Sequence, residues 1–381
     1  MARLIFGRSA QGLAFGASYG AEIVIQGSDF ASTFDNYPLL LCSDSDTNNL
    51  VNLLFGAGTS CLNNGGDLRA CTDPYDEGTR LPLEVVRCLT ATNGLEIWIN
   101  VGTVTALTNK TIYLLWGIPG ATQPGSSDPY GAQAVWNRTG SGPQWNFVTH
   151  MHDFAGQDHV KNSTSSGLVC NKLANDQPQE SGSGTGLYDD DIHQDWDDSI
   201  REYITVPWAA PLDLGTSVGV MIWVKWPQYL GVPSGYPRML SRKNSYLDGN
   251  GWEISFITAD PNHFEILGSS STAWRPLLPF NWNDDSAGPR SNGWHCLQVD
   301  FTSGQAAALV DGVSVGSGSI TTLAENTQPL VIGDNVGHSE SIFKGRISEV
   351  RLAVNAIADD LWKSMYTAMA DPENHVTVTS L

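Results

Sequence analysis

The sequence predicts an all-β protein that is built from two β-sandwich domains. The clearest signal lies in residues 293–317, where three short strands follow one another. Apolar and polar residues alternate along residues 295–301, which is the period of two expected of a strand. Asp311 and Gly312 predict a two-residue hairpin turn, because the centre of such a turn needs positive φ, which this pair adopts at little cost. The one convincing helix is residues 358–369, and many short strands with so little helix favour sandwiches.

Further strands are expected in both domains, wherever short apolar or alternating runs lie between turn residues. In the first domain these runs are residues 37–42, 95–101 and 111–116. In the second domain they are residues 218–224, 252–256 and 343–352.

Changes in composition divide the chain into four segments. Residues 1–28 are rich in Gly, Ala and Ser, which predicts an arm or an extra edge strand for docking rather than part of a core. Residues 29–135 form the first domain, and the Gly/Pro/Ser-containing residues 136–144 are interpreted as a linker. Residues 145–381 form the second domain. A chain of 381 residues is long enough for two separate cores.

The chain is strongly acidic, with 40 Asp and Glu against 20 Lys and Arg, for a formal net charge of −20. Binding to nucleic-acid phosphates or to anionic lipid needs clustered positive charge, so neither nucleic acid nor membrane is expected as a partner. A solvated acidic surface is the simplest interpretation, and acid-rich loops that hold Ca²⁺ are the alternative. No run of 18 apolar residues predicts a transmembrane helix, and residues 1–19 lack the apolar stretch of a secretory signal.

The sequence contains six cysteines, and no CxxC pair points to zinc. They are Cys42, Cys61, Cys71, Cys88, Cys170 and Cys296. Cys61 with Cys71, or Cys42 with Cys88, would form plausible disulfides. Without a secretory signal, buried reduced thiols are the expectation.

A series of short motifs runs in order through the second domain. They are Val218–Trp226 (VGVMIWVKW), Met239–Lys243, Gly251–Ile254, Gly293–His295 with Val310–Gly312, Pro329–Gly333, and Phe343–Arg351 (FKGRISEVR). In this order they resemble a laminin-G-like (LamG), concanavalin A-like domain, with Ser348 where the family usually has Asp. The resemblance implies a jelly-roll sandwich with a short C-terminal helix.

The first domain carries a second resemblance. Its motifs are Gly66–Arg69 (GDLR), Leu81–Val85 (LPLEV), Glu96–Ile99 (EIWI) and Ile112–Pro119. They are similar to those of the DUF2341 family, which often precedes lectin-like domains of this kind. Residues 1–28 fall outside both resemblances.

No catalytic residues are predicted. Glycosidase chemistry needs two carboxylates across a cleft, and neither the E-x-D-x-x-E string of jelly-roll glucanases nor a G-x-S-x-G motif is present. Glu253 and Glu265 are isolated in sequence and are interpreted as strand residues on the solvent face. The histidines of the HMHD string, His150 and His152, are interpreted as loop or edge-strand residues rather than metal ligands.

Ligand sites are predicted mainly from the resemblance. LamG-like domains often hold one Ca²⁺ at the rim of a sheet, and hard oxygen ligands suit that ion. The candidates are Asp189, Asp191, Asp195 and Asp334, with Asn335 beside the last; a solvated acidic loop is the alternative for the first three. Sugar binding needs exposed aromatic platforms, for which Trp274 and Trp282 are candidates, with core packing as the alternative.

These features favour a non-enzymatic structural protein of a bacteriophage virion, either a capsid-decoration or a tail-associated subunit. Residues 1–28 would dock on other virion subunits or on further copies of the chain, and the lectin-like domain would face outward toward host glycans. Such a protein would be assembled in the host cytoplasm. The alternative is a carbohydrate-binding adhesin module of a bacterial surface protein, which would be extracellular, and a glycoside hydrolase is the remote alternative.

Overall fold

The computed structural model divides into two compact units, and each is described by itself. Unit 1 comprises residues 1–135 and 371–381, and unit 2 comprises residues 136–370. The structure describes residues 12–43, 49–56, 58, 60–90, 93–136, 143–154, 159–172, 179–181, 193–196, 202–212, 215–225, 236–245, 247, 250–257, 259–260, 262–269, 272–279, 293–302, 304–324, 326–337 and 343–381.

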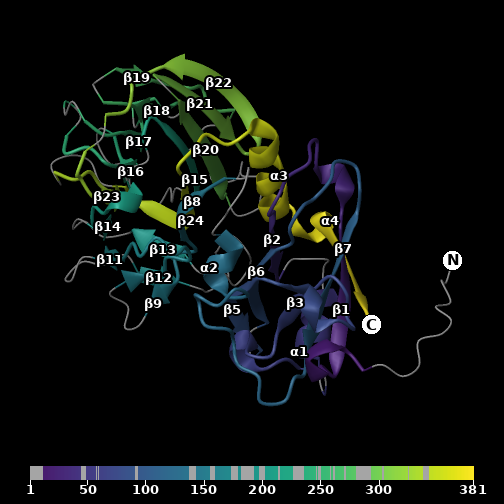
Figure 1. Cartoon of the computed structure of the whole chain (residues 1–381). Coiled ribbons are helices and arrows are strands. Elements are labelled where there is room, and N and C mark those ends of the chain that lie inside the picture. Colours follow the sequence, from purple (N-terminus) through teal and green to yellow (C-terminus); the bar gives the residue numbers. More distant parts are fainter. Residues whose placement is uncertain are drawn as a thin grey trace. The chain divides into compact units, whose positions relative to one another are not determined.

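Unit 1 contains two antiparallel sheets (Figure 1). The five-stranded sheet has the order β25-β1-β7-β3-β4, with bounds Val376–Ser380, Tyr19–Ile25, Lys110–Trp116, Arg69–Cys71 and Arg80–Leu81. The three-stranded sheet has the order β2-β6-β5, with bounds Pro38–Cys42, Gly94–Asn100 and Leu83–Leu89. The helices are α1 (Asn49–Phe55), α4 (Pro372–His375) and α2 (Ala132–Trp136), whose last residue is the first of unit 2. Short 3₁₀ turns occur at Ala14–Gly16, Gly27–Asp29, Asn63–Gly65 and Glu77–Thr79.

Unit 1 is closed by the last residues of the chain. β25 pairs along β1 from Ala21↔Ser380 to Ile25↔Val376. Just before β25, the buried imidazole of His375 lies with its Nδ1 2.7 Å from Asp29 Oδ2. The rings of Phe30 and His375 meet edge to face, with their centroids 5.7 Å apart.

This arrangement differs from the predicted boundaries. β1 is an interior strand, paired with β25 on one side and with β7 on the other, so residues 19–25 are not an arm. Residues 1–11 lie outside the described part of the chain. The sequence also places residues 371–381 in the second domain, whereas they belong to unit 1. Pairing between strands more than 350 residues apart leaves no local signal, which is why the sequence pattern missed it.

Unit 2 is a sandwich of two antiparallel sheets. The nine-stranded sheet has the order β19-β18-β17-β16-β23-β14-β11-β10-β9, with bounds Ala273–Trp274, Phe264–Leu267, Glu253–Phe256, Arg238–Ser241, Leu330–Ile332, Ile204–Val206, Cys170–Lys172, His159–Val160 and Asp153–Phe154. The eight-stranded sheet has the order β12-β13-β24-β15-β20-β21-β22, with bounds Gln179–Ser181, His193–Trp196, Gly345–Ala353, Ser217–Lys225, His295–Thr302, Gln305–Val310 and Val313–Ser319, and β8 (Trp145–Thr149) also pairs with β24. A 3₁₀ turn at Ala210–Leu212 and helix α3 (Asp359–Ala370) complete the described elements.

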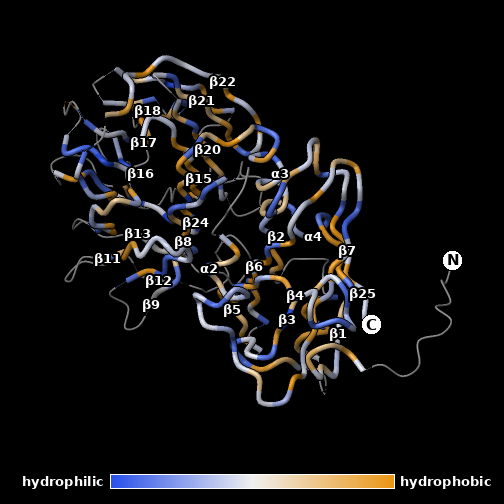
Figure 2. The backbone as a smooth tube through the Cα atoms, viewed as in Figure 1, coloured by the Kyte–Doolittle hydropathy of each residue, from blue (hydrophilic) through white to orange (hydrophobic). Residues whose placement is uncertain are grey.

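The core of unit 2 lies between these sheets. Alternate residues of β15, including Val220 and Ile222, join a single cluster of buried apolar side chains with residues of β17 and β18 such as Ile254 and Ile266. In Figure 2, apolar stretches are visible along β15 and β20 of this unit. The predicted fold class is confirmed: the protein is mostly β-sheet with few helices, and unit 2 ends in a short helix.

The predicted meander and helix are both present. Asp311 and Gly312 have φ of 50° and 72° at the turn between β21 and β22, as the hairpin requires. Helix α3 packs on the outer face of the eight-stranded sheet, where Trp362 Nε1 donates to Asp300 Oδ2 at 2.6 Å. Gln298 Nε2 donates to the carbonyl oxygen of Trp362 at 2.8 Å. The helix therefore covers polar as well as apolar groups of β20.

All six cysteines are buried and outside disulfides, and the structure brings together a pair that was not predicted. The Sγ atoms of Cys61 and Cys88 lie 3.5 Å apart. Interaction with Cys88, together with burial, raises the pKa of the Cys61 thiol far above its usual range.

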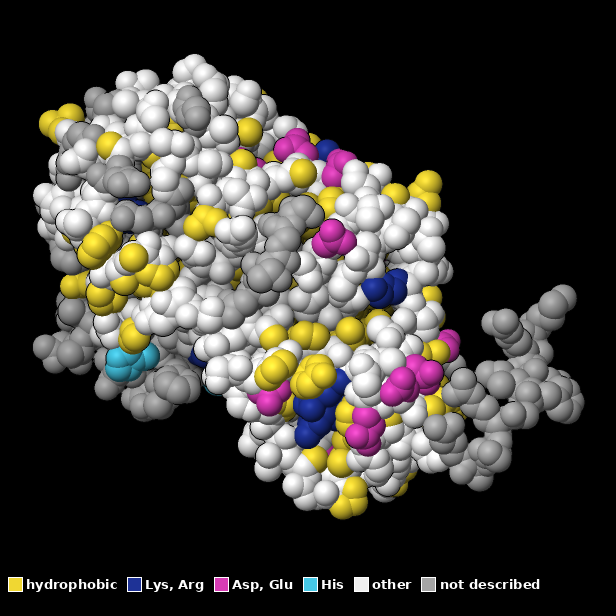
Figure 3. All heavy atoms as spheres, in the orientation of Figure 1, with side chains coloured by type: hydrophobic (Ala, Val, Ile, Leu, Met, Phe, Trp, Pro, Cys, Tyr) yellow, Lys and Arg dark blue, Asp and Glu magenta, His cyan; other side chains and the backbone are white. Residues whose placement is uncertain are grey.

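Figure 3 shows that acidic side chains on the visible face are scattered among polar and apolar ones rather than gathered into one field. In the ranges that the structure describes, no helix combines the length and apolar character that crossing a bilayer requires.

A chain that begins at residue 29 tests whether β1 is integral to unit 1. Its loss deprives both β7 and β25 of a paired strand, so we expect the amides of these strands to lose protection in hydrogen–deuterium exchange. A chain that begins at residue 12 keeps β1 and is the control, in which protection should be retained. Unchanged protection of β7 and β25 in the shorter chain would show that residues 12–28 are a dispensable arm.

Asp300 gives unit 2 a pH dependence of known sign. Burial raises the pKa of this carboxyl to about 7, although Ile357 N and Trp362 Nε1 donate to it. The folded state therefore binds a proton that the unfolded state has already lost, and this group's contribution to stability falls as the pH rises from about 4 to about 7.

We expect the Asp300→Ala variant to lose this part of the pH dependence. The measurement is urea unfolding across that pH range, compared with wild type and with Glu373→Gln, an exposed carboxyl in unit 1. Parallel stability curves for wild type and Asp300→Ala would refute the assignment.

Candidate functional site

The candidate site lies on the outer face of the nine-stranded sheet of unit 2, where three neighbouring strands carry polar side chains. Along β17, Ile254 and Phe256 point into the core, so Glu253 and Ser255 lie on the opposite face. Ser255 stands opposite Glu265 of β18, and Glu253 stands opposite Ser241 of β16. The pairing register thus gathers these side chains on one face.

The two glutamates are buried, which corrects the sequence-based interpretation. Glu253, Ser255 and Glu265 each have 0% of their surface exposed, so they are not solvent-face residues. Alternation shows which side chains share a face of a strand, but it does not show whether that face is covered. Burial makes their polar contacts decisive, because a buried charge needs a partner.

Glu253 is fully engaged by neighbours from β16. Arg238 Nε donates to Oε1 at 3.0 Å, and Ser241 Oγ donates to Oε2 at 3.1 Å. Burial raises the pKa of Glu253, and the Arg238 guanidinium and the Ser241 hydroxyl offset part of that rise. With both of its oxygens occupied, Glu253 is suited to organising the face rather than to passing a proton.

Glu265 connects this buried face to the surface. Arg275 Nε donates to Glu265 Oε2 at 2.7 Å, and 47% of the Arg275 side chain is exposed. The Arg275 guanidinium lies 5.7 Å from the ring centroid of Tyr236, and its Nη2 donates to Tyr236 Oη at 3.4 Å. The hydrogen bond with Glu265 raises the pKa of Arg275, so the guanidinium is a fixed positive charge at the surface.

The same face of the sheet holds two further buried oxygens. Glu265 Oε1 and Ser255 Oγ have no hydrogen-bond partner among the residues that the structure describes. Leaving such an atom unsatisfied costs roughly 1–3 kcal/mol. We call this set of residues the Arg275 cluster: Tyr236, Arg238, Ser241, Glu253, Ser255, Glu265 and Arg275. It offers a half-exposed donor at the surface, Arg275, whereas the two unpartnered oxygens are themselves buried.

The predicted sugar platforms are placed differently. Trp274 lies in β19, next to Arg275, but its indole is partly buried and packs against the core. A Cβ on Gly318 of β22 would overlap that indole, so Trp274 bridges the edges of the two sheets. Trp282 falls outside the described residues.

The predicted calcium ligands are partly outside the described part of the chain. Asp189 and Asp191 fall outside the described residues. The structure describes only the backbone of Asp195, which lies in β13. Asp334 and Asn335 are fully buried after β23, where Asn335 N donates to Asp334 Oδ1 at 2.8 Å. The calcium site therefore stays a prediction.

The histidine string contributes one buried ion pair. His150 Nδ1 lies 2.5 Å from Glu349 Oε1, and Arg351 Nε donates to Glu349 Oε2 at 3.3 Å. Burial opposes the ionisation of Glu349, but Arg351 and His150 together hold its pKa below the usual value. The Trp136 ring lies 4.8 Å below the Arg351 guanidinium.

Sequence reasoning missed Tyr236, Arg238 and Arg275. Arg238 and Glu253 are 15 residues apart, and Glu265 and Arg275 are 10 apart, so each pair meets only through strand register. The available signal was the alternation of Glu253 and Ser255 with apolar residues, together with Arg275 directly after a short strand.

Comparison with known families supports the fold of unit 2. Residues 198–360 match the family Laminin_G_3, described as the concanavalin A-like lectin/glucanases superfamily. This span contains the whole Arg275 cluster. No curated protein matches the sequence.

Several solved structures are similar to part of the chain. The binding domain of Paraclostridial Mosquitocidal Protein 1 is 11% identical, with a TM-score of 0.44 over 59% of this chain and 52% of that one. The botulinum neurotoxin serotype D binding domain is 13% identical, with a TM-score of 0.42 over 59% of this chain and 51% of that one. The match thus spans about half the length of these toxin domains.

A third similar structure is domain 4 of AbnA, a GH43 extracellular arabinanase from Geobacillus stearothermophilus, in complex with arabinotriose. It is 15% identical, with a TM-score of 0.41 over 61% of this chain and all of that one. At these identities and TM-scores, no statement about the function of this chain follows from the likenesses.

Arg238 tests how the buried face is held together. In Arg238→Met the charge of Glu253 stays buried without its partner, so we expect a loss of about 3–5 kcal/mol of stability. The double variant Arg238→Met/Glu253→Leu should recover most of this loss, since both charges are gone. Lys363→Met, which changes an exposed cation, is the control and should change stability by less than about 0.5 kcal/mol.

Urea unfolding of the four proteins measures these differences. Equal stability of wild type and Arg238→Met, or no recovery in the double variant, would contradict the ion pair.

Proposed function

We propose that unit 2 is a non-catalytic glycan-recognition module that binds sugar at the Arg275 cluster. The observation that carries the proposal is the pair of acceptors without partners, Glu265 Oε1 and Ser255 Oγ, behind the half-exposed Arg275. Sugar hydroxyls both donate and accept hydrogen bonds, so a sugar can use the half-exposed guanidinium as donor, and the two buried oxygens become its acceptors when the Arg275 side chain moves aside. The Tyr236 ring beside Arg275 adds an apolar surface for the C–H groups of a sugar ring.

Recognition fits the glutamates better than hydrolysis does. Glycoside hydrolysis needs one carboxyl that gives up a proton and a second that acts as nucleophile or base. Both oxygens of Glu253 are already engaged, and Glu265 is tied to Arg275 through one oxygen. The remaining oxygen of Glu265 suits the acceptance of a hydroxyl hydrogen.

The family match supports recognition of carbohydrate, because the description of that family names lectins and glucanases and residues 198–360 span the cluster. Burial of the acceptors would also give selectivity. A site that is built to bond a hydroxyl discriminates strongly against an analogue that lacks it, because its own polar groups are then left unsatisfied.

The proposal extends to the biological setting of unit 2. A bacteriophage virion protein that turns its lectin-like unit toward host glycans stays a prediction, with the bacterial adhesin as alternative. The similarity of unit 1 to DUF2341 and the partnership with other virion subunits likewise stay predictions. If such partners exist, unit 1 would meet them through its folded surface, since β1 is committed to its sheet.

Glycan binding by the full-length chain tests the proposal. A broad glycan array, with and without Ca²⁺, should give defined hits that calorimetry confirms in solution. We expect Arg275→Ala and Glu265→Gln each to weaken binding of the best hit by about tenfold or more, because a lost hydrogen bond to a charged group is worth about 1.5–3 kcal/mol.

Lys363→Ala, an exposed cation on α3, is the matched control and should bind as wild type does. The proposal fails if no glycan binds under either condition, or if Arg275→Ala and Glu265→Gln bind with unchanged affinity.

A further inference from the structure

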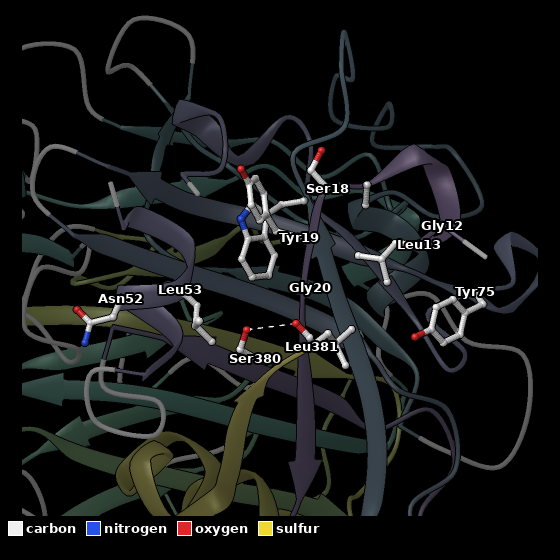
Figure 4. Close-up of a pocket in the computed structure, with 12 residues that line it drawn as sticks. Gly12, Leu13, Ser18, Tyr19, Gly20, Asn52, Leu53, Tyr75, Ser380 and Leu381 are labelled. Atoms are coloured by element: carbon white, nitrogen blue, oxygen red, sulfur yellow. Dashed lines mark hydrogen bonds between the residues drawn. The ribbon is translucent and has the colours of Figure 1, made fainter. Parts of the chain in front are cut away.

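Unit 1 has a pocket of its own, with a volume of about 500 Å³. Figure 4 shows it between three elements: the start of β1, helix α1, and the end of β25. Asn52 and Leu53 come from α1 on one side, and Tyr75 comes from the turn before β4 on the other. All of the lining residues belong to unit 1, so this pocket is separate from the Arg275 cluster.

The floor of the pocket is a fixed aromatic pair. Tyr19 and Trp116 are direct cross-strand partners at the ends of β1 and β7. Their ring centroids lie 6.2 Å apart, with 28° between the ring planes. Tyr19 Oη donates to the carbonyl oxygen of Gly58 at 2.7 Å, and Trp116 is 1% exposed. Both rings are therefore held before any ligand arrives, which lowers the entropic cost of binding.

A glycine shapes the side of the pocket next to this pair. A Cβ at Gly20 would lie 2.7 Å from a methyl carbon of Leu381 and 2.8 Å from one of Leu115. The missing side chain lets Leu381 lie close over β1, where Leu381 N donates to Gly20 O at 3.0 Å. Leu381 remains 50% exposed and contributes an apolar wall.

The side chains at the rim of the pocket are polar and uncharged. Ser18, Asn52 and Ser380 are exposed and present two hydroxyl groups and one amide. Tyr75 is 39% exposed and presents both a ring and a hydroxyl. None of the lining side chains carries a charge, although the chain has a net charge of −20. An ionic ligand would find no side chain of opposite charge here, whereas a neutral ligand needs none.

We propose that this pocket binds an uncharged saccharide of one or two rings. A sugar ring has apolar C–H faces and a periphery of hydroxyl groups, and the pocket offers the matching aromatic and aliphatic walls with a neutral hydrogen-bonding rim. Tyr75 and Leu381 contact the ring faces, and Asn52 with the two serines binds the hydroxyls. The chain then has a second sugar site, in the unit that the lectin-like resemblance does not cover.

The test uses the full-length chain and a panel of neutral probes: glucose, galactose, mannose, N-acetylglucosamine and lactose. Saturation-transfer NMR at millimolar probe concentration should detect at least one of them. The Asn52→Ala/Tyr75→Ala variant changes two side chains at the rim and should weaken that binding by roughly tenfold.

Two controls establish whether the signal comes from this pocket. Leu107→Ala changes a residue of unit 1 that is 81% exposed and outside the pocket, and it should bind as wild type does. Arg275→Ala should also leave this signal unchanged, so the result does not depend on the site in unit 2.

The proposal is overturned if no probe binds, or if binding survives in Asn52→Ala/Tyr75→Ala. It is also overturned if the signal disappears in Arg275→Ala, which would assign it to unit 2. The proposal is also overturned if no saccharide binds but the apolar probe anilinonaphthalene sulfonate does, and if the Tyr75 variant loses that binding. The pocket would then be an apolar docking site.

Discussion

The structure of unit 2 depends on the burial of both faces of its central strands. One face of each sheet forms the sandwich core, as in any sandwich. The other face, which alternation would normally leave in water, is also buried: Trp223 and Gln298 on one sheet, and Glu253 and Glu265 on the other, are fully buried. Polar groups on these outer faces have lost water, so each needs an internal partner or becomes costly.

The two outer faces meet this constraint in different ways. On the eight-stranded sheet, helix α3 supplies the cover, and its Trp362 both donates to Asp300 and accepts from Gln298. Trp223 stacks on Tyr366 of the same helix, with 10° between the rings. On the nine-stranded sheet the partners come from neighbouring strands. Neither match is complete: Glu265 Oε1 and Ser255 Oγ on this sheet, and Gln298 Oε1 and Trp223 Nε1 on the other, have no hydrogen-bond partner among the described residues. The nine-stranded sheet differs in that its unpartnered oxygens belong to the same cluster as a half-exposed arginine, Arg275.

Local patterns in the sequence predicted the local structure well. The Asp311-Gly312 turn, the meander around it and helix α3 all follow from short-range signals, since period and turn chemistry are properties of adjacent residues. Long-range pairing was not predictable in the same way. The placement of β25 beside β1, and of Cys61 beside Cys88, depends on closure of the whole of unit 1. The prediction for Glu253 and Glu265 was wrong for a related reason. Alternation correctly placed both side chains on the face away from the sandwich core, but it carries no information on whether that face is buried.

Hydrogen–deuterium exchange of the full-length chain, with and without its best-binding glycan, tests whether the Arg275 cluster binds sugar. We expect added glycan to slow exchange in peptides covering residues 236–241, 253–256 and 264–275, where the Arg275 cluster lies. Peptides of α3, on the opposite sheet, serve as the internal reference and should not change. Slower exchange confined to other parts of unit 2, with these three segments unaffected, would contradict the assignment of the binding face.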